Sequence, residues 1–205
     1  MTIMLSIKVN LSKFVCILKD TLHTMSNNHK VVLLIITILS FLISNCAINS
    51  DNFLKQIEVT DIEAKQALDL ALSKINSVYL WGGNGTDSFD CSGLIVWSYQ
   101  NVFKDNYIFT NGIELVNDVT INELYNFNAN NRTKDNVKPG DIIFISNMND
   151  FITHGGLVIE AKENSVKFIN ASSYYEKVII DEWDYNELVR GQWIVGFGRV
   201  LRSKK

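Results

Sequence analysis

The chain has 205 residues, of which 47% are hydrophobic and 20% charged, and its formal net charge is −3. This composition is typical of a globular protein and excludes a chain that is disordered as a whole. The part before Cys46 carries +3 and the remainder −6. A mildly acidic body argues against a nucleic-acid partner. The single proline, Pro139, excludes a proline-rich stalk.

An apolar stretch near the N-terminus, residues 31–44, follows Lys30. Its 14 residues are fewer than the about 20 of a transmembrane helix and fit the about 7–15 of a signal-peptide core. We therefore expect residues 1–45 to form a signal-peptide region. We also hypothesise that translation starts at Met25, because this gives a compact polar segment before the apolar stretch. An uncleaved signal anchor is the alternative.

Residues 42–46, with the sequence LISNC, resemble the lipobox of bacterial lipoproteins. The resemblance implies cleavage before Cys46 and a diacylglycerol on its sulfur. It also implies a protein of the bacterial cell envelope, held at the membrane and facing the periplasm or cell wall. Asn45 departs from the small residue that usually precedes the cysteine.

Cleavage at Cys46 would leave 160 residues, with Cys91 as the free thiol and His154 as the one imidazole. No disulfide framework and no CxxC metal pair is possible with this inventory. We therefore expect neither a metal nor a cofactor, and any thiol or imidazole chemistry must use these two side chains. The sequence does not indicate an oligomeric state.

The first predicted elements of the mature chain are helical. Residues 49–59 indicate a short polar tether. Thr60 and Glu63 form a capping-box pattern, and apolar residues at helical spacing continue to position 75. Three glycines at positions 82–85 predict a tight loop. A second helix follows over about 91–102, with Ser88 or Asp90 as its cap.

Strands dominate the second half. A short helix near 122–127 is expected among Asn-rich loops, and short apolar runs bounded by turn residues then predict strands. These runs cover residues 141–146, 156–161, 166–170, 177–180 and 196–201. Helices first and strands after predict an α+β fold, with the N-terminal helices packed on a mostly antiparallel sheet of about five strands.

Three polar residues could act together. Cys91 begins a predicted helix, where free N–H groups and the macrodipole favour a thiolate. His154 precedes Gly155 and Gly156, which would let backbone or substrate approach closely. If the two following strands form a hairpin, Asn170 lies beside His154 and can orient the imidazole. Taken singly, each residue is more often structural, and only their combination favours catalysis.

Five segments resemble the NlpC/p60 family of cell-wall cysteine peptidases, in the family's order and spacing, from about residue 60 to 201. Their sequences are YLWGGNG at 79–85, FDCSGLI at 89–95, KPGDIIF at 138–144, HGGLVI at 154–159 and INASS at 169–173. The block around Cys91 is specific, whereas the other four segments are weak signals on their own.

The resemblance implies a papain-like α+β domain over residues 60–205, after a lipidated Cys46 and a tether to residue 59. It implies hydrolysis of peptidoglycan stem peptides, between D-glutamate and the diamino acid, through a thioester. The implied site has Cys91 as nucleophile, His154 as general base, Asn170 as the orienting residue, Tyr79 as an oxyanion- or substrate-assisting hydroxyl, and Asp90, Ser92 and Trp81 as substrate-binding residues.

Two departures from the family pattern leave alternatives open. Residues 106–112 (NYIFTNG) do not match the segment that borders the substrate cleft in many relatives. Gly155 stands where the family usually has valine. An amidase or acyltransferase acting on another amide is therefore an alternative. An inactive envelope scaffold is another, although such a scaffold has no need of all three polar residues.

Overall fold

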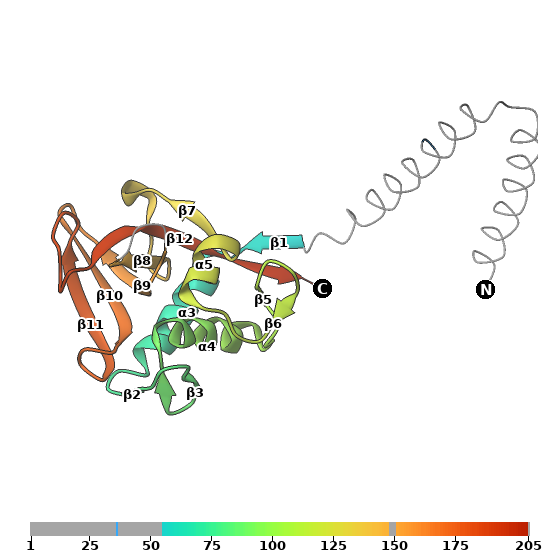
Figure 1. Cartoon of the computed structure of the whole chain (residues 1–205), viewed down its shortest axis with the longest axis horizontal. Helices are drawn as coiled ribbons and strands as arrows, with labels where there is room; N and C mark the ends of the chain where they lie inside the picture. The colour runs from blue at the N-terminus through green and yellow to red at the C-terminus, as the bar shows by residue number, and fades with distance from the viewer. Residues whose placement is uncertain (1–35, 37–54, 148–150, 205) are drawn as a thin grey trace, which may run out of the picture. The chain divides into compact units, whose positions relative to one another are not determined.

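The computed structural model describes residues 36, 55–147 and 151–204 (Figure 1). Cys46, Met25 and the predicted signal region, apart from Ile36, lie outside the described residues. Within the described ranges, no helix is both long enough and apolar enough to cross a membrane.

Three helices form where the sequence predicts them. They are α3 (Asp61–Leu72), α4 (Cys91–Phe103) and α5 (Ile121–Phe127). The predicted capping box of α3 is confirmed, because the Glu63 N–H donates to Thr60 Oγ1 and the Glu63 carboxylate accepts from the Thr60 N–H. The helix ends at Leu72, earlier than predicted, since the chain turns through Asn76 at a φ of 69°.

All five predicted strands form and pair antiparallel in the order β12-β8-β9-β10-β11. Their bounds are β8 (Ile142–Ser146), β9 (His154–Ala161), β10 (Ser165–Ser172), β11 (Lys177–Asp184) and β12 (Trp193–Lys204). This pairing confirms the α+β fold and the mostly antiparallel sheet.

Short strands that the sequence did not predict enlarge this sheet to ten strands in the described part of the chain. They are β1 (Lys55–Glu58), β2 (Val78–Tyr79), β3 (Asn84–Gly85), β4 (Ser88–Phe89) and β7 (Ala129–Arg132), while β5 (Phe109–Thr110) and β6 (Leu115–Val116) form a separate hairpin. Runs of two to four residues are too short for a period-two pattern to identify them.

β1 changes the expected boundary of the domain. The sequence indicated a tether up to residue 59, but Lys55–Glu58 pairs antiparallel with the last residues of β12. Lys55 lies opposite Lys204 and Glu58 opposite Leu201 (Figure 1). These four residues therefore belong to the domain, because their backbone groups complete the edge of the sheet.

The sheet has two differently covered faces. One face packs on α3 and α4 and contains the larger core, with Leu68, Leu94, Phe144, Leu157 and Ile169 among its buried residues. The other face lacks these helices and has a smaller core built from Ile143, Ile145, Val158, Val166, Phe168, Trp183 and Phe197. Alternate residues of β8, β9 and β10 serve the two cores, as the strand period requires.

A buried ion pair joins the helices to the sheet. Arg199 of β12 is 1% exposed, and its Nε donates to the carboxylate of Asp141, which is fully buried just before β8. The Tyr99 hydroxyl of α4 donates to the Gly140 carbonyl at 2.8 Å. A buried charge is tolerated only where it is paired, so these contacts fix the position at which β8 begins.

Candidate active site

Asp90 caps the helix that carries the thiol. Its Oδ1 accepts from the Gly93 N–H at 2.7 Å and from the Ser92 hydroxyl at 3.0 Å, and its Oδ2 accepts from the Gly82 N–H at 2.9 Å. Asp90 therefore ties the glycine turn to the start of α4. About one of the roughly four acceptor positions of a carboxylate remains for a ligand.

Two glycines hold the thiol segment against that turn. A Cβ on Gly93 would lie 2.0 Å from the Gly83 carbonyl oxygen, which is far inside van der Waals contact. The same oxygen accepts from the Asp90 N–H at 2.8 Å. Any side chain at position 93 would push α4 away from the turn and displace Cys91.

The predicted contact between His154 and Asn170 is present. Nε2 of His154 lies 3.1 Å from Oδ1 of Asn170, across the antiparallel β9–β10 pair. An amide oxygen can only accept, so Nε2 carries the hydrogen and Nδ1 is the basic nitrogen of the neutral ring. Asn170 is 1% exposed, so water does not compete for this hydrogen bond.

The thiol lies beside the residue that follows His154. Backbone N–H groups of Cys91, Ser92 and Gly155 interact with the sulfur and favour its thiolate form. The two glycines after His154 are needed by the protein itself, because a Cβ on Gly155 would lie 2.6 Å from Ile121 Cδ1 and one on Gly156 would lie 2.2 Å from the Ile169 oxygen. The close approach expected at these glycines is thus made by neighbouring protein atoms.

The protonation of the resting site differs from the sequence expectation. Burial, with a smaller contribution from the Asp90 charge, raises the pKa of Cys91 to about 12. Burial also lowers the pKa of His154, although the Asn170 hydrogen bond opposes this. The helix N-terminus does not overcome the cost of burying a thiolate. The resting pair at pH 7 is therefore a thiol and a neutral imidazole.

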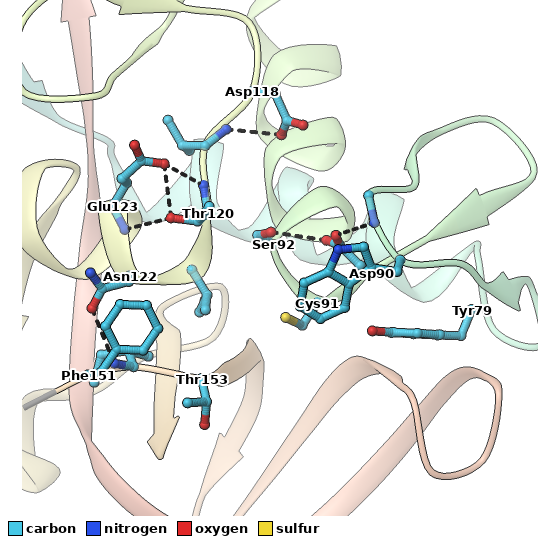
Figure 2. A pocket seen from close by; sticks show the side chains of 15 residues that line it. Tyr79, Asp90, Cys91, Ser92, Asp118, Thr120, Asn122, Glu123, Phe151 and Thr153 are labelled. Carbon is cyan, nitrogen blue, oxygen red and sulfur yellow. Dashed lines mark hydrogen bonds between the residues drawn. The ribbon is translucent and has the colours of Figure 1, made fainter. Parts of the chain in front are cut away.

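A cleft of about 540 Å³ opens at Cys91. On one side the Tyr79 hydroxyl points toward Cys91, whose sulfur points away from it, and the start of α5 lies on the other side of the cleft (Figure 2). Trp81 lies at the rim and is 86% exposed, whereas Ser92 is buried. His154 and Asn170 are not among the residues that line the cleft. The lining consists of Tyr79, Trp81, Gly82, Asp90, Cys91, Ser92, Asp118, Val119, Thr120, Ile121, Asn122, Glu123, Phe151, Ile152 and Thr153.

The far wall of the cleft was not predicted from the sequence. It consists of residues 118–123 and 151–153. A signal for part of it exists, because Thr120 and Glu123 repeat the capping-box pattern of the first helix and form the same reciprocal bonds (Figure 2). This pattern would have placed the start of α5 at residue 121.

Among the residues that the structure describes, the charged side chains that line the cleft are all acidic. They are Asp90, Asp118 and Glu123, and the lining contains neither lysine nor arginine. Asp118 accepts from Asn84 Nδ2 at 3.0 Å, and burial raises the pKa of its carboxyl. Burial is also the main cause that raises the pKa of the Tyr79 hydroxyl, and the nearby charges of Cys91 and Asp90 raise it further. Such a lining favours ligands that carry ammonium groups and disfavours extra carboxylates.

Several known proteins are similar to this chain in sequence or fold. The chain is similar to a protein named "Probable endopeptidase p60" of Listeria innocua, with 30% identity over 139 residues, covering 63% of this chain and 23% of that protein. The structure is similar to that of NlpC1 from Trichomonas vaginalis, with a TM-score of 0.50 and 25% identity over 72% of this chain and 47% of the other. A Bacteroides uniformis structure described as an N-acetylmuramoyl-L-alanine amidase matches in fold, with a TM-score of 0.50 and 15% identity, over 70% of this chain and all of the other.

The chain thus spans less than a quarter of the Listeria relatives it matches. The model of the NlpC/P60 family matches residues 76–196, more than half of the chain and all of the elements from β2 to β11. The protein belongs to the NlpC/P60 family.

Proposed function

We propose that this protein is a cysteine peptidase that hydrolyses peptidoglycan stem peptides at the bond between D-glutamate and the diamino acid. The observation that carries the proposal is the Cys91 thiol beside Gly155, directly after an imidazole held by Asn170. A nucleophile, a base and a residue that orients the base make up the arrangement required for covalent catalysis.

The first half of the reaction forms a thioester. Nδ1 of His154 takes the thiol proton as the Cys91 sulfur attacks the amide carbon. The N–H groups at the start of α4, together with the Tyr79 hydroxyl, supply donors for the oxyanion. The C–N bond then breaks, and the imidazolium gives its proton to the leaving amine.

The second half releases the acid. His154 takes a proton from water as the water oxygen attacks the thioester carbon. The C–S bond then breaks, and the imidazolium gives this proton to the leaving sulfur, which restores the thiol and the neutral ring. Because both resting partners are neutral, the thiol gives its proton to His154 only as the sulfur attacks the substrate. The acidic lining supports a substrate whose diamino acid carries an ammonium group, and Asp90 and Ser92 would contact its amino end.

Lipid attachment at Cys46 is the second part of the proposal, and it would hold the enzyme at the membrane of a bacterial envelope. Tethering would raise its concentration at the wall. The support for it is the LISNC sequence after an apolar stretch of signal-peptide length.

Two cysteine variants of the full chain test both parts. The wild type, Cys91→Ala and Cys46→Ala are expressed in a bacterial host, solubilised in detergent and incubated with muropeptides, and the products are assigned by mass spectrometry. We expect Cys91→Ala to lose cleavage while remaining in the membrane fraction. Cys46→Ala should cleave normally in detergent but leave the membrane fraction.

The alternatives give different outcomes in the same assay. Product profiles of wild type and Cys91→Ala that do not differ would disprove the peptidase and leave the inactive scaffold. Cysteine-dependent cleavage at another bond would support an amidase of different specificity. Retention of Cys46→Ala in the membrane would disprove the lipid anchor without affecting the peptidase.

A further inference from the structure

Two opposite charges lie near the strand of Asn170, on the face of the sheet without helices. Asn170 of β10 is opposite Ile179 of β11, so Asp181, two residues further, points to the same face as Asn170. Nη1 of Arg190 lies 3.7 Å from Oδ2 of Asp181, and the two side chains are only 31% and 21% exposed. We call Asp181 and Arg190 the rear pair.

Aromatic contacts fix the arginine of the rear pair. Its Nη2 donates to the Tyr175 hydroxyl at 2.7 Å, and its guanidinium lies 4.6 Å from the ring centroid of Tyr174 and 4.9 Å from that of Tyr175. Stacking on two rings leaves the guanidinium little freedom to move away from Asp181.

The backbone of Arg190 is held in an unfavourable conformation. Arg190 and Gly191 have φ values of 56° and 75°, and Val189 and Gln192 exchange hydrogen bonds of 2.9 and 3.0 Å around them. These features describe a type I′ turn, whose first central position prefers Asn, Asp or Gly. This conformation is unfavourable for an arginine, and it directs the side chain toward Asp181 and the two tyrosines.

The two charges of the rear pair shift the pKa of His154 in opposite directions. The charged groups that influence the imidazole are Asp181 from β11, Arg190 from the turn and Asp90 from the cap of α4. The two carboxylates raise the pKa of His154 and Arg190 lowers it, each by less than the lowering due to burial. The uncharged neighbour Asn170 bonds Nε2 directly.

We propose that Asp181 and Arg190 are positioning residues that set the protonation of His154 by opposing charges. Asp181 alone would increase the fraction of protonated ring, which cannot act as a base. Arg190 alone would weaken the hold of the ring on a proton between the two halves of the reaction. Together the two charges largely cancel at the ring, so burial keeps the resting imidazole neutral and it can still accept a proton when the thiol reacts, and this last step rests on the proposed function.

The test is an NMR titration of the imidazole in the full chain. His23→Gln and His29→Gln are placed in all samples, which leaves His154 as the one histidine. Arg190→Gln should raise its midpoint and Asp181→Asn should lower it, each by about half to one pH unit at low salt. The double variant should return close to the parent.

A matched control comes from the same strand. Glu182 follows Asp181 but points to the opposite face, where it bonds Lys162 and Ser165. Glu182→Gln removes the same charge and should leave the titration of His154 unchanged. Shifts of the same sign in Arg190→Gln and Asp181→Asn, or no shift in either, would overturn the proposal.

A variant that does not fold leaves the proposal testable. If circular dichroism shows that Arg190→Gln is unfolded, Arg190→Lys keeps the charge and should keep the midpoint, while Asp181→Asn must still lower it. A changed midpoint in Arg190→Lys with an unchanged one in Asp181→Asn would again overturn it. The titration needs no substrate, so failure of the proposed peptidase would appear separately, as missing cleavage by a protein whose His154 titrates as expected.

Discussion

The two faces of the sheet supply different halves of the site. The helix-covered face holds the thiol, on a helix whose cap and glycines are neighbours in the sequence. The other face holds the imidazole, the amide and the rear pair, which meet only through the pairing of β9, β10 and β11. The thiol is thus placed by local structure and the base by long-range register, so different mutations should disturb them.

The largest expected effect comes from the buried ion pair between β12 and the residue that precedes β8. Asp141→Asn leaves the buried Arg199 with only the exposed Asp61 as a charged partner. Loss of one member of a buried pair costs about 3–5 kcal/mol. We expect the free energy of unfolding in urea to fall by this amount, and activity measured below the transition to fall only with the folded fraction. A variant as stable as wild type would show that this ion pair does not stabilise the fold.

The pH dependence of alkylation distinguishes the contribution of the Cys91 thiol from that of the His154 base. With the pKa of Cys91 at about 12, the rate of its reaction with iodoacetamide, followed on the Cys91 peptide by mass spectrometry, should rise about tenfold per pH unit from 7 to 10. His154→Ala should slow the reaction more at pH 7 than at pH 9, because the neutral imidazole takes up the thiol proton. A plateau below pH 7 would instead indicate a thiolate already formed in the resting protein.

The smallest expected effect compares two identical capping boxes. Thr60→Ala and Thr120→Ala each remove a side-chain cap, which costs about 1 kcal/mol. Only the second cap lies in the cleft wall. Both variants should lose similar stability, while only Thr120→Ala should raise the KM for muropeptides, by a few-fold. Equal KM values in both variants would show that the start of α5 does not contribute to substrate binding.

The local half of the molecule could be predicted more completely than the long-range half. Capping patterns at Thr60 and Asp90 locate α3 and α4 because caps are signals within three residues of the helix. The contact between His154 and Asn170 could be predicted by assuming a hairpin, because strand register fixes which residues meet. Their catalytic roles stay predictions.

What the sequence did not predict depends on the packing of distant segments. The far wall of the cleft joins residues 118–123 to residues 151–153, and no periodic pattern links them. The raised pKa of Cys91 could not be predicted either, because helix position is visible in the sequence but burial is not. The rear pair was missed for a similar reason, since Asp181 and Arg190 meet only through a turn at an uncommon φ.

The pairing of β1 with the end of β12 has a consequence for how the domain can be joined to others. Because Lys55 lies opposite Lys204, the chain enters and leaves the domain at one place. Neither strand contributes to the lining of the cleft. The domain can therefore be inserted into a loop of another protein, or circularly permuted with a short linker between β12 and β1, while its catalytic face stays unchanged.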